Sequence, residues 1–307
     1  MKKFLKFLIL SPPKLILYLL KKYAGLLSYL LKIDIVSQIF SSVFFELENR
    51  TQRVVHINDN KCVVTLDFYT PNEMCKMRAD TFSSKEPEIL NWIDKHGGDD
   101  TFWDIGSNIG LYSIYYGLSK SGRVVSFEPS VFNLKQLAKN ISLNGLSEKI
   151  DLNPIPLSDS TGYADFSVSS LEEGSAQNAF GVSYGFDGNN LNQQVNYSLL
   201  GMKGDEIIKY GYVNKIPKMI KLDVDGIEHL ILEGMKEILQ SDNCYSVFVE
   251  VNDDFQICQA GFADQITDLE SHQSSSLADS LCGEVGKMHF YQSLSREINA
   301  IIHSLSA

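Results

Sequence analysis

FWDIGSNIG, residues 102–110, is the stretch that decides the fold. Its apolar start predicts a strand ending at Ile105, and its small residues predict a tight turn that leads into a helix. Gly106 lets the backbone turn tightly and approach a ligand, and Gly110 lets the helix pack closely on the strand. The helix N-terminus favours an anionic group, while Asp104 offers a carboxylate to an ammonium group. The stretch therefore predicts a ligand-binding strand–turn–helix unit.

Two other interpretations of this loop compete with that of a cofactor site for S-adenosylmethionine (SAM). A dinucleotide site needs G-x-G-x-x-G, but the second and third glycine positions hold Asn108 and Leu111. An acid such as Asp104 is also out of place beside a pyrophosphate, whereas it suits the amino group at the methionine end of SAM. The remaining alternative is a purely structural βα turn.

The sequence around the loop alternates strand and helix patterns. Expected strands cover 101–105, 124–127, 150–156, 219–224 and 246–251, and expected helices cover 111–118, 133–143 and 228–239. This order predicts an α/β fold with a doubly wound, mostly parallel sheet, whose ligands bind at the carboxyl ends of the strands. Glu128 ends the second strand, where an acid accepts hydrogen bonds from both ribose hydroxyls. Its position relative to Asp104 strengthens the prediction of a SAM site.

Charged residues also interrupt the later strands, which should be almost wholly apolar. In IKLDVDGIE, residues 220–228, alternation places Lys221, Asp223 and Asp225 on one side. Glu250 closes the next strand. Buried charges are costly unless they are paired or used, so the alternatives are a structural Lys–Asp pair or a functional site. Two strand-end acids at one cleft indicate a base, a metal site or anchors for sugar hydroxyls.

Taken in order, these motifs resemble the FkbM family of SAM-dependent methyltransferases. The resemblance covers roughly residues 78–255, and its motifs are TFSSKEPEILNWI (81–93), FWDIGSNIGLYS (102–113), FEPSVFNL (127–134), NISLNGL (140–146), LSDSTG (157–162), IKLDVDGIEHLILEGM (220–235) and VFVEVN (247–252). It implies a class I methyltransferase fold, which is Rossmann-like, with a seven-stranded sheet and one antiparallel strand near its end. It also implies O-methylation, often of a sugar hydroxyl in a polysaccharide or natural product.

The resemblance further implies roles for single residues. The expected cofactor-binding residues are Asp104, Gly106, Ser107, Asn108, Gly110 and Glu128, with Ser158 and Asp159 on the adenine side. We predict that Asp223 and Glu250 line the acceptor site, one acting as base or both holding a divalent cation, which would lower the pKa of a sugar hydroxyl. His229 is a further candidate base, although a histidine one turn into a helix is more often structural.

The N-terminal segment differs in charge from the rest of the chain. Residues 1–33 contain seven lysines and no acid, although the whole chain has a net charge of −11. From Lys14 to Lys32 the polar and small residues recur at helical spacing, which predicts an amphipathic helix with a lysine-lined edge. Such a helix can bind the surface of an anionic membrane, or it can pack on the protein's own core or on a partner subunit. Neither a cleavage pattern nor a run long enough to span a bilayer is present.

The expected organisation has three parts. They are the basic membrane-surface segment 1–33, an accessory β/α region 34–95 that is β-rich over 34–80, and a methyltransferase domain 96–307. Within the last part, 170–200 predicts a long loop or lid. In the tail from about residue 263, Met288–Gln292 is compatible with a strand and Arg296–Leu305 with a short helix.

Composition narrows the function classes and the compartment. The negative net charge argues against binding nucleic acid through the overall field. Five scattered cysteines show no disulfide or zinc pattern, which favours the cytoplasm, with the basic segment placing the protein at the inner face of the membrane. The expected partner is a hydroxyl-bearing acceptor such as a sugar or glycan. The alternatives are a non-sugar acceptor and a non-catalytic, membrane-associated module that retains the fold. A methyltransferase for small amines is disfavoured because Asp223-Val224-Asp225-Gly226 occupies the place of its Asn/Asp-Pro-Pro-Tyr-type motif.

Overall fold

The computed structural model describes residues 2–31, 34–58, 61–185, 187–250 and 288–292. The chain divides into two compact units, residues 1–50 and 51–307. The first unit consists of helices α1 (Lys2–Leu31) and α2 (Ile35–Glu48). The expected helix from Lys14 is therefore longer, and the division falls after Arg50 instead of after residue 33.

Helix α2 corrects the prediction of a β-rich region beginning at residue 34. Its β-branched and aromatic residues favour a strand in isolation. However, Asp34 caps the helix by accepting a hydrogen bond from the Ser37 backbone N–H at 2.9 Å. The Ser28 hydroxyl of α1 accepts hydrogen bonds from the backbone N–H groups of Ile35 and Val36 at 3.0 and 3.3 Å. These bonds join the end of α1 to the start of α2.

Most large apolar side chains of this unit that the structure describes are exposed. Ala24 of α1 is buried, whereas the exposed set includes Leu15, Ile16, Leu19, Leu20, Tyr23, Leu26, Leu30, Ile39, Val43, Phe44 and Phe45. Within the described residues, no helix combines the length and the hydrophobicity that crossing a bilayer requires.

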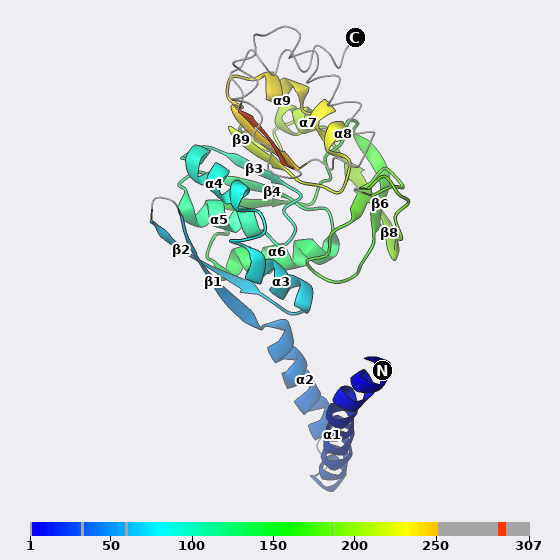
Figure 1. Cartoon of the computed structure of the whole chain (residues 1–307). Helices are drawn as coiled ribbons and strands as arrows, with labels where there is room; N and C mark the ends of the chain where they lie inside the picture. The colour runs from blue at the N-terminus through cyan, green and yellow to red at the C-terminus, as the bar shows by residue number, and fades with distance from the viewer. Residues whose placement is uncertain (1, 32–33, 59–60, 186, 251–287, 293–307) are drawn as a thin grey trace. The chain divides into compact units, whose positions relative to one another are not determined.

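A central sheet organises the second unit (Figure 1). The described strands follow the order β11-β10-β9-β3-β4-β5, and their bounds are β3 (Phe102–Ile105), β4 (Val124–Phe127), β5 (Ile150–Asn153), β9 (Met219–Leu222), β10 (Ser246–Glu250) and β11 (Met288–Gln292). All neighbouring pairs are parallel except β10 and β11. This sheet confirms the doubly wound α/β prediction, the antiparallel strand near the end, and the strand at 288–292. Six of the seven expected strands lie in the described residues, and the helix expected at 296–305 lies outside them.

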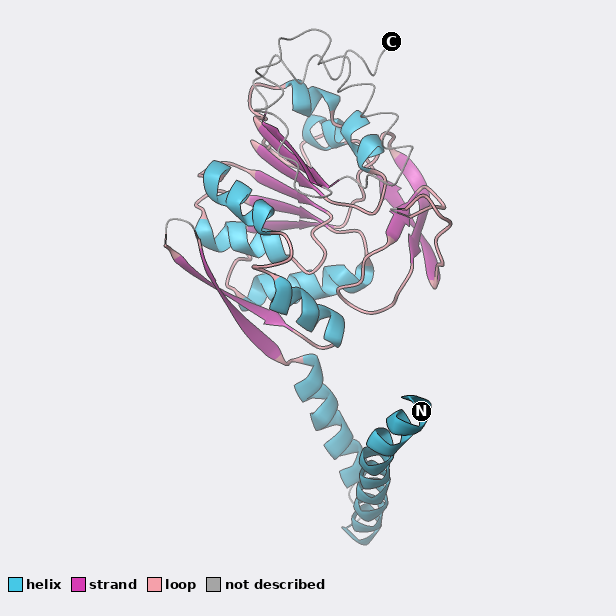
Figure 2. Ribbon diagram, in the orientation of Figure 1, coloured by secondary structure: helices cyan, strands magenta, loops and turns pink. Residues whose placement is uncertain are grey.

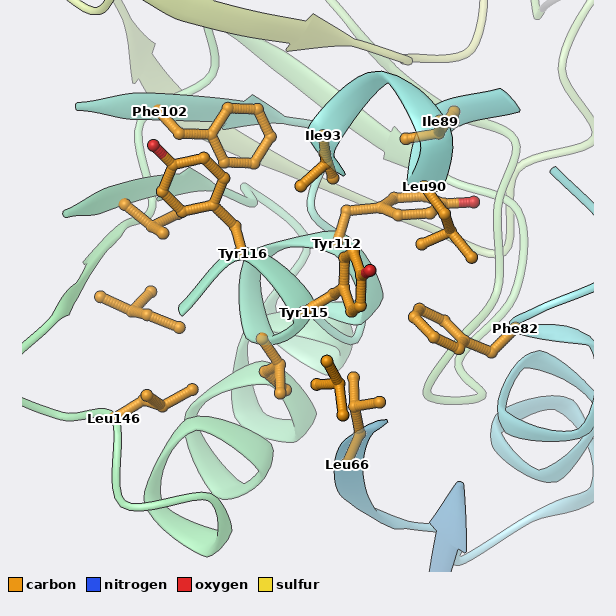
Figure 3. Packing of buried hydrophobic residues seen from close by; sticks show 14 of the residues in the cluster. Leu66, Phe82, Ile89, Leu90, Ile93, Phe102, Tyr112, Tyr115, Tyr116 and Leu146 are labelled. Atoms are coloured by element: carbon orange, nitrogen blue, oxygen red, sulfur yellow. The ribbon is translucent and has the colours of Figure 1, made fainter. Parts of the chain in front are cut away.

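Helices cover both faces of the sheet (Figure 2). The helices are α3 (Glu73–Thr81), α4 (Pro87–His96), α5 (Leu111–Ser119), α6 (Val131–Leu143), α7 (Gly204–Lys209), α8 (Glu228–Glu233) and α9 (Lys236–Gln240). Successive strand residues point to opposite faces, so Phe102 joins the core beneath α4, α5 and α6, while Trp103 joins the core beneath α7, α8 and α9. Figure 3 shows the first core, in which Phe102 stacks on Tyr116 with ring centroids 4.9 Å apart.

Two antiparallel structures flank this framework. The hairpin of β1 (Thr51–Ile57) and β2 (Val63–Tyr69) contacts α5 and α6, and thus the expected β-rich region exists over residues 51–69. A separate three-stranded sheet has the order β7-β6-β8, formed by β6 (Gly162–Val168), β7 (Asn178–Phe180) and β8 (Val195–Gly201). The prediction of one long loop over 170–200 is therefore wrong, because β7 and β8 gain their pairing from β6, outside that polar stretch.

Candidate active site

A cavity of about 340 Å³ lies at the carboxyl ends of the central strands. Gly106 follows β3, Glu128 follows β4, Asp223 follows β9, and Glu250 is the last residue of β10; all four line the cavity. Parallel strands bring their carboxyl ends to one edge of the sheet, which is where ligands of such sheets bind. The structure thus assembles residues from four separate motifs around one space.

Steric limits explain both glycines of the loop after β3. Gly106 has φ +77°, and a Cβ there would lie 1.9 Å from the carbonyl oxygen of Asp223. Gly110 has φ +90°, and its Cβ would lie 2.4 Å from Leu137 Cδ1 on α6. Only glycine satisfies both the left-handed backbone and the close approach. The loop is therefore pressed against the end of β9 on one side and against α6 on the other.

Glu128 is held so that its carboxylate faces the cavity. Its Oε2 accepts a hydrogen bond from the Asn108 backbone N–H at 2.7 Å, and its Oε1 accepts one from the Ser130 N–H at 2.9 Å. Burial raises the pKa of Glu128 to about 7, opposed by these two backbone hydrogen bonds. Each carboxylate oxygen has a second lone pair. Glu128 can therefore accept hydrogen bonds from both hydroxyls of a ribose.

Ser107 and Asn108 stabilise the loop itself. The Ser107 hydroxyl donates to the Asp104 carbonyl oxygen at 2.6 Å, and the Asn108 side-chain amide donates to the Ser175 carbonyl oxygen at 2.8 Å. The second bond ties the loop to the segment between β6 and β7. Asn108 also lines the cavity, whereas Ser107 lines a smaller cavity beside it.

Asp104, a residue expected to bind the cofactor, lies outside the lining of both cavities. It is completely buried. The register of β3 with β9 places Asp104 beside Lys221, whose Nζ lies 3.5 Å from Asp104 Oδ1, and Oδ2 accepts a hydrogen bond from the Ser113 hydroxyl at 2.5 Å. A buried carboxylate needs such partners, so the register of β3 with β9 places Asp104 in the interior.

The apolar part of the cavity is formed by residues that the sequence did not single out. Ile155, Pro156 and Leu157 line it after β5, together with Phe166 and Ile231. Neither Ser158 nor Asp159 is among the lining residues. The Ser158 backbone N–H donates to the carbonyl oxygen of Met202, which directly follows β8, at 3.0 Å.

Three interacting charged side chains, Lys221, Asp223 and Glu250, lie at the ends of β9 and β10. Lys221 Nζ lies 3.0 Å from Asp223 Oδ2, and the Lys221 side chain is only 1% exposed. Burial opposes the charge of Asp223, but the Lys221 ammonium and a hydrogen bond from Glu250 lower the pKa of Asp223 well below its usual value. The charge of Asp223, followed by burial, raises the pKa of Glu250. The two pKa shifts are opposite in direction, so Glu250 holds a proton more readily than Asp223 does.

This donor set does not fit the expected divalent cation. A cation site with oxygen ligands needs several ionised or carbonyl oxygens. Here the Lys221 ammonium already lies 3.0 Å from Asp223 Oδ2, and its charge opposes a second cation beside that carboxylate. Across the part of the chain that the structure describes, no group of three or more His, Cys, Asp or Glu side chains is placed to hold a metal ion.

His229 is not brought into the site. It lies on α8, lines neither cavity, and has its pKa lowered by burial. Its neighbour Glu228 lines the large cavity instead, and Glu228 Oε1 accepts hydrogen bonds from the backbone N–H groups of Val224 and Gly226 at 3.2 and 3.4 Å. Burial raises the pKa of Glu228 to about 8.

Comparisons with known proteins agree with this geometry. Residues 104–274, more than half of the chain, match the family described as the methyltransferase FkbM domain. The chain belongs to the FkbM methyltransferase family. The hexuronic acid methyltransferase AglP of Haloferax volcanii is 32% identical over 158 residues, which cover 50% of this chain and 56% of AglP. The chain thus matches little more than half the length of this curated relative.

Solved structures with similarity to the chain include two methyltransferases. The methyltransferase FkbM from Methylobacillus flagellatus is 18% identical, with a TM-score of 0.32, over 50% of this chain and 33% of that chain. A SAM-dependent methyltransferase from Agrobacterium tumefaciens is 10% identical, with a TM-score of 0.36, over 65% of this chain and 52% of that chain.

Several residues of this FkbM-family site were not singled out from the sequence. Arg78 on α3 and Lys85 line both cavities, and Glu86 lines the smaller one. Glu86 is buried, forms an ion pair with Lys85, and accepts a hydrogen bond from the Tyr112 hydroxyl. Lys221 Nζ lies 5.3 Å from the centroid of the Tyr112 ring. The motif at 81–93 marked this segment as part of the family pattern, but only tertiary packing shows which of its side chains reach the site.

Proposed function

We propose that the protein transfers a methyl group from SAM to a hydroxyl group of a sugar. The observation that carries this proposal is that Glu128 and the acid pair Asp223–Glu250 line the same cavity. The chain that forms this cavity belongs to the FkbM methyltransferase family. The name of the relative AglP specifies a hexuronic acid, which is a sugar derivative, and so supports a sugar acceptor.

The residues of the large cavity fit SAM. Glu128 would hold the ribose hydroxyls, and Ile155–Leu157 and Ile231 would enclose the adenine ring. The backbone from Gly106 to Asn108 would lie against the middle of the ligand. When bound, SAM supplies a methyl group already activated by its sulfonium, so the protein mainly has to orient the acceptor and remove its proton.

Asp223 is the residue that we propose orients the acceptor. Its carboxylate is ionised at neutral pH and lines the cavity, so it can accept the hydrogen bond of an acceptor hydroxyl. The Lys221 ammonium lowers the pKa of Asp223, so Asp223 is a weak base. The proton of the acceptor hydroxyl therefore moves to Asp223 late, as the new O–C bond forms. The charge of Asp223 raises the pKa of Glu250 and so favours its protonated form, which donates a hydrogen bond to Asp223 and holds it in place.

The first test is calorimetric titration with S-adenosylhomocysteine (SAH). Micromolar binding that disappears in Glu128→Ala supports the cofactor assignment. Correctly folded protein that does not bind SAH refutes it and favours a non-catalytic module. Transfer of a labelled methyl group from SAM to a panel of sugars and glycans then tests the acceptor class, and methylation of amines but not sugars contradicts it.

We further propose that the first unit binds the cytoplasmic face of an anionic membrane. Support comes from the exposed apolar side chains of α1 and α2 and from the seven lysines in residues 1–33. An interfacial helix buries its apolar side chains at the acyl boundary while its lysines contact anionic headgroups. Membrane contact through this segment would place the site near acceptors carried on lipids.

A further inference from the structure

A second, smaller cavity adjoins the large one. Its volume is about 110 Å³, enough for several water-sized groups. Arg78, Lys85, Gly106, Asn108 and Asp223 line both cavities. Because the two spaces share these residues, one ligand can extend from the large cavity into the small one.

The lining of the small cavity carries charges of both signs. Arg78, Lys85 and Lys221 are cationic, while Glu86 and Asp223 contribute carboxylates. An α-amino acid group also carries both signs, with a carboxylate and an ammonium on one carbon. Electrostatic complementarity of this kind distinguishes a ligand from its uncharged analogues. The cavity therefore suits a zwitterionic group better than a neutral one.

The three cations differ in the partners that they already have. The ammonium of Lys85 forms an ion pair with Glu86, and that of Lys221 lies 3.0 Å from Asp223 Oδ2 and 3.5 Å from Asp104 Oδ1, so both charges are matched within the protein. Arg78 uses its Nε to donate to the Gly174 carbonyl oxygen, and among the described residues it forms no ion pair. The positive charge of Arg78 lowers the pKa values of Glu128 and Asp225 in the large cavity, whereas burial raises them.

Arg78 therefore has the properties of a carboxylate-binding residue. The Nε bond to Gly174 holds the guanidinium, which lies in the last turn of α3, in position. Its terminal N–H groups remain for a ligand, and two parallel N–H groups match the two oxygens of a carboxylate. Asp104, the residue first expected at this end of the cofactor, lies outside both cavities.

We propose that the small cavity holds the methionyl group of SAM and that Arg78 binds its carboxylate. This inference rests on the proposed SAM-dependent function and names the residue that recognises the amino acid end of the cofactor. Arg78 is then a specificity residue, because it distinguishes SAM and SAH from adenosine derivatives that lack the amino acid.

The test compares two ligands on the full chain by calorimetry. SAH contains the amino acid group, whereas 5′-methylthioadenosine shares the adenosine and the sulfur but lacks it. Wild-type protein should bind SAH more tightly than methylthioadenosine. Arg78→Gln should weaken SAH about 10- to 100-fold, the effect of losing hydrogen bonds to a charged group, and change methylthioadenosine less than about threefold. Arg78→Lys should bind SAH with an affinity between those of the wild type and of Arg78→Gln, since lysine keeps the charge but lacks the planar guanidinium.

Two variants serve as controls. Lys76→Gln removes a cation from the same helix, but Lys76 pairs with Asp80 and lines neither cavity, so both affinities should stay unchanged. Lys85→Gln removes a second cation of the cavity, one that is already paired with Glu86, and should affect SAH less than Arg78→Gln. A selective loss of SAH binding in Lys85→Gln instead of Arg78→Gln would overturn the assignment.

The remaining outcomes separate this inference from the proposed function. If Arg78→Gln weakens neither ligand, or weakens both equally, Arg78 does not bind the carboxylate. If wild-type protein binds SAH and methylthioadenosine with equal affinity, the small cavity is not the methionyl subsite, although the SAM site stands. If wild-type protein binds neither ligand, the proposed function itself fails.

Discussion

Glu128 should make cofactor binding depend on pH. Burial raises the pKa of Glu128 to about 7 in the free protein. Ribose hydroxyls donate only to an acceptor, so binding favours the ionised carboxylate and releases a proton wherever Glu128 was protonated. The affinity for the cofactor is therefore highest above the pKa that Glu128 has in the free protein, and it falls as the pH drops through that pKa.

The magnitude follows from the ionised fraction. Only protein with an ionised Glu128 binds SAH. The apparent Kd for SAH should therefore be nearly constant above about pH 8 and about 100-fold higher at about pH 5. Glu128→Gln loses the charge and places an amide N–H₂ against the backbone N–H of Asn108 or Ser130. This variant should lose about 2–4 kcal/mol of binding free energy, roughly 30- to 1000-fold in Kd, and its profile should be flat.

The assay is calorimetric titration with SAH from about pH 5 to about pH 8.5, with the fold checked by circular dichroism at each pH. Asp225 and Glu228 also line the cavity, and burial raises their pKa values to about 6 and about 8. Asp225→Asn and Glu228→Gln should therefore retain the step near pH 7. A wild-type Kd that does not change with pH, or a Glu128→Gln variant with wild-type affinity, would refute the reasoning.

Three further predictions follow from the geometry. Gly106→Ala should abolish SAH binding and destabilise the fold by about 2 kcal/mol or more, because its Cβ would meet the Asp223 carbonyl, whereas Gly98→Ala, with open space around it, should leave the melting temperature and SAH affinity nearly unchanged. Asp223→Asn should lower methyl-transfer turnover about 100-fold or more, while Glu250→Gln, which mimics a carboxyl group that is already protonated, should cost less than about tenfold; equal losses in steady-state turnover would contradict the proton assignment. Lys21→Gln combined with Lys22→Gln should weaken sedimentation with vesicles rich in phosphatidylglycerol about 30-fold, at about 1 kcal/mol per lysine, and vesicles of phosphatidylcholine alone should bind weakly; equal binding to both lipids would count against the electrostatic part of the membrane proposal.

Local sequence carried much of the fold and part of the site. Gly106 and Gly110 were recognisable because a sharp turn with left-handed backbone restricts the residue type at those positions. Glu128 was recognisable because its distance along the chain from the first loop matches one strand–helix–strand repeat. The alternation of strand and helix patterns predicted the parallel sheet, which the order of its described strands confirms.

Other features depend on contacts between residues far apart in sequence. The pairing of Gly162–Val168 with Val195–Gly201 creates β8 within a polar stretch that predicted only a loop. The capping of α2 by Asp34 overrides residues that favour a strand. In both places the deciding hydrogen bonds outweigh the preferences of the local residues.

For this protein, the sequence by itself determined the α/β framework, the family, and the residues whose roles follow from backbone geometry. The tertiary structure alone decided that Asp104 lies beneath the site beside Lys221, that the charge of Asp223 raises the pKa of Glu250, and that Arg78 on an earlier helix lines the large cavity. The physical reason is that charge state and access depend on burial and on neighbouring charges, which are set by strand register and helix packing across the whole domain.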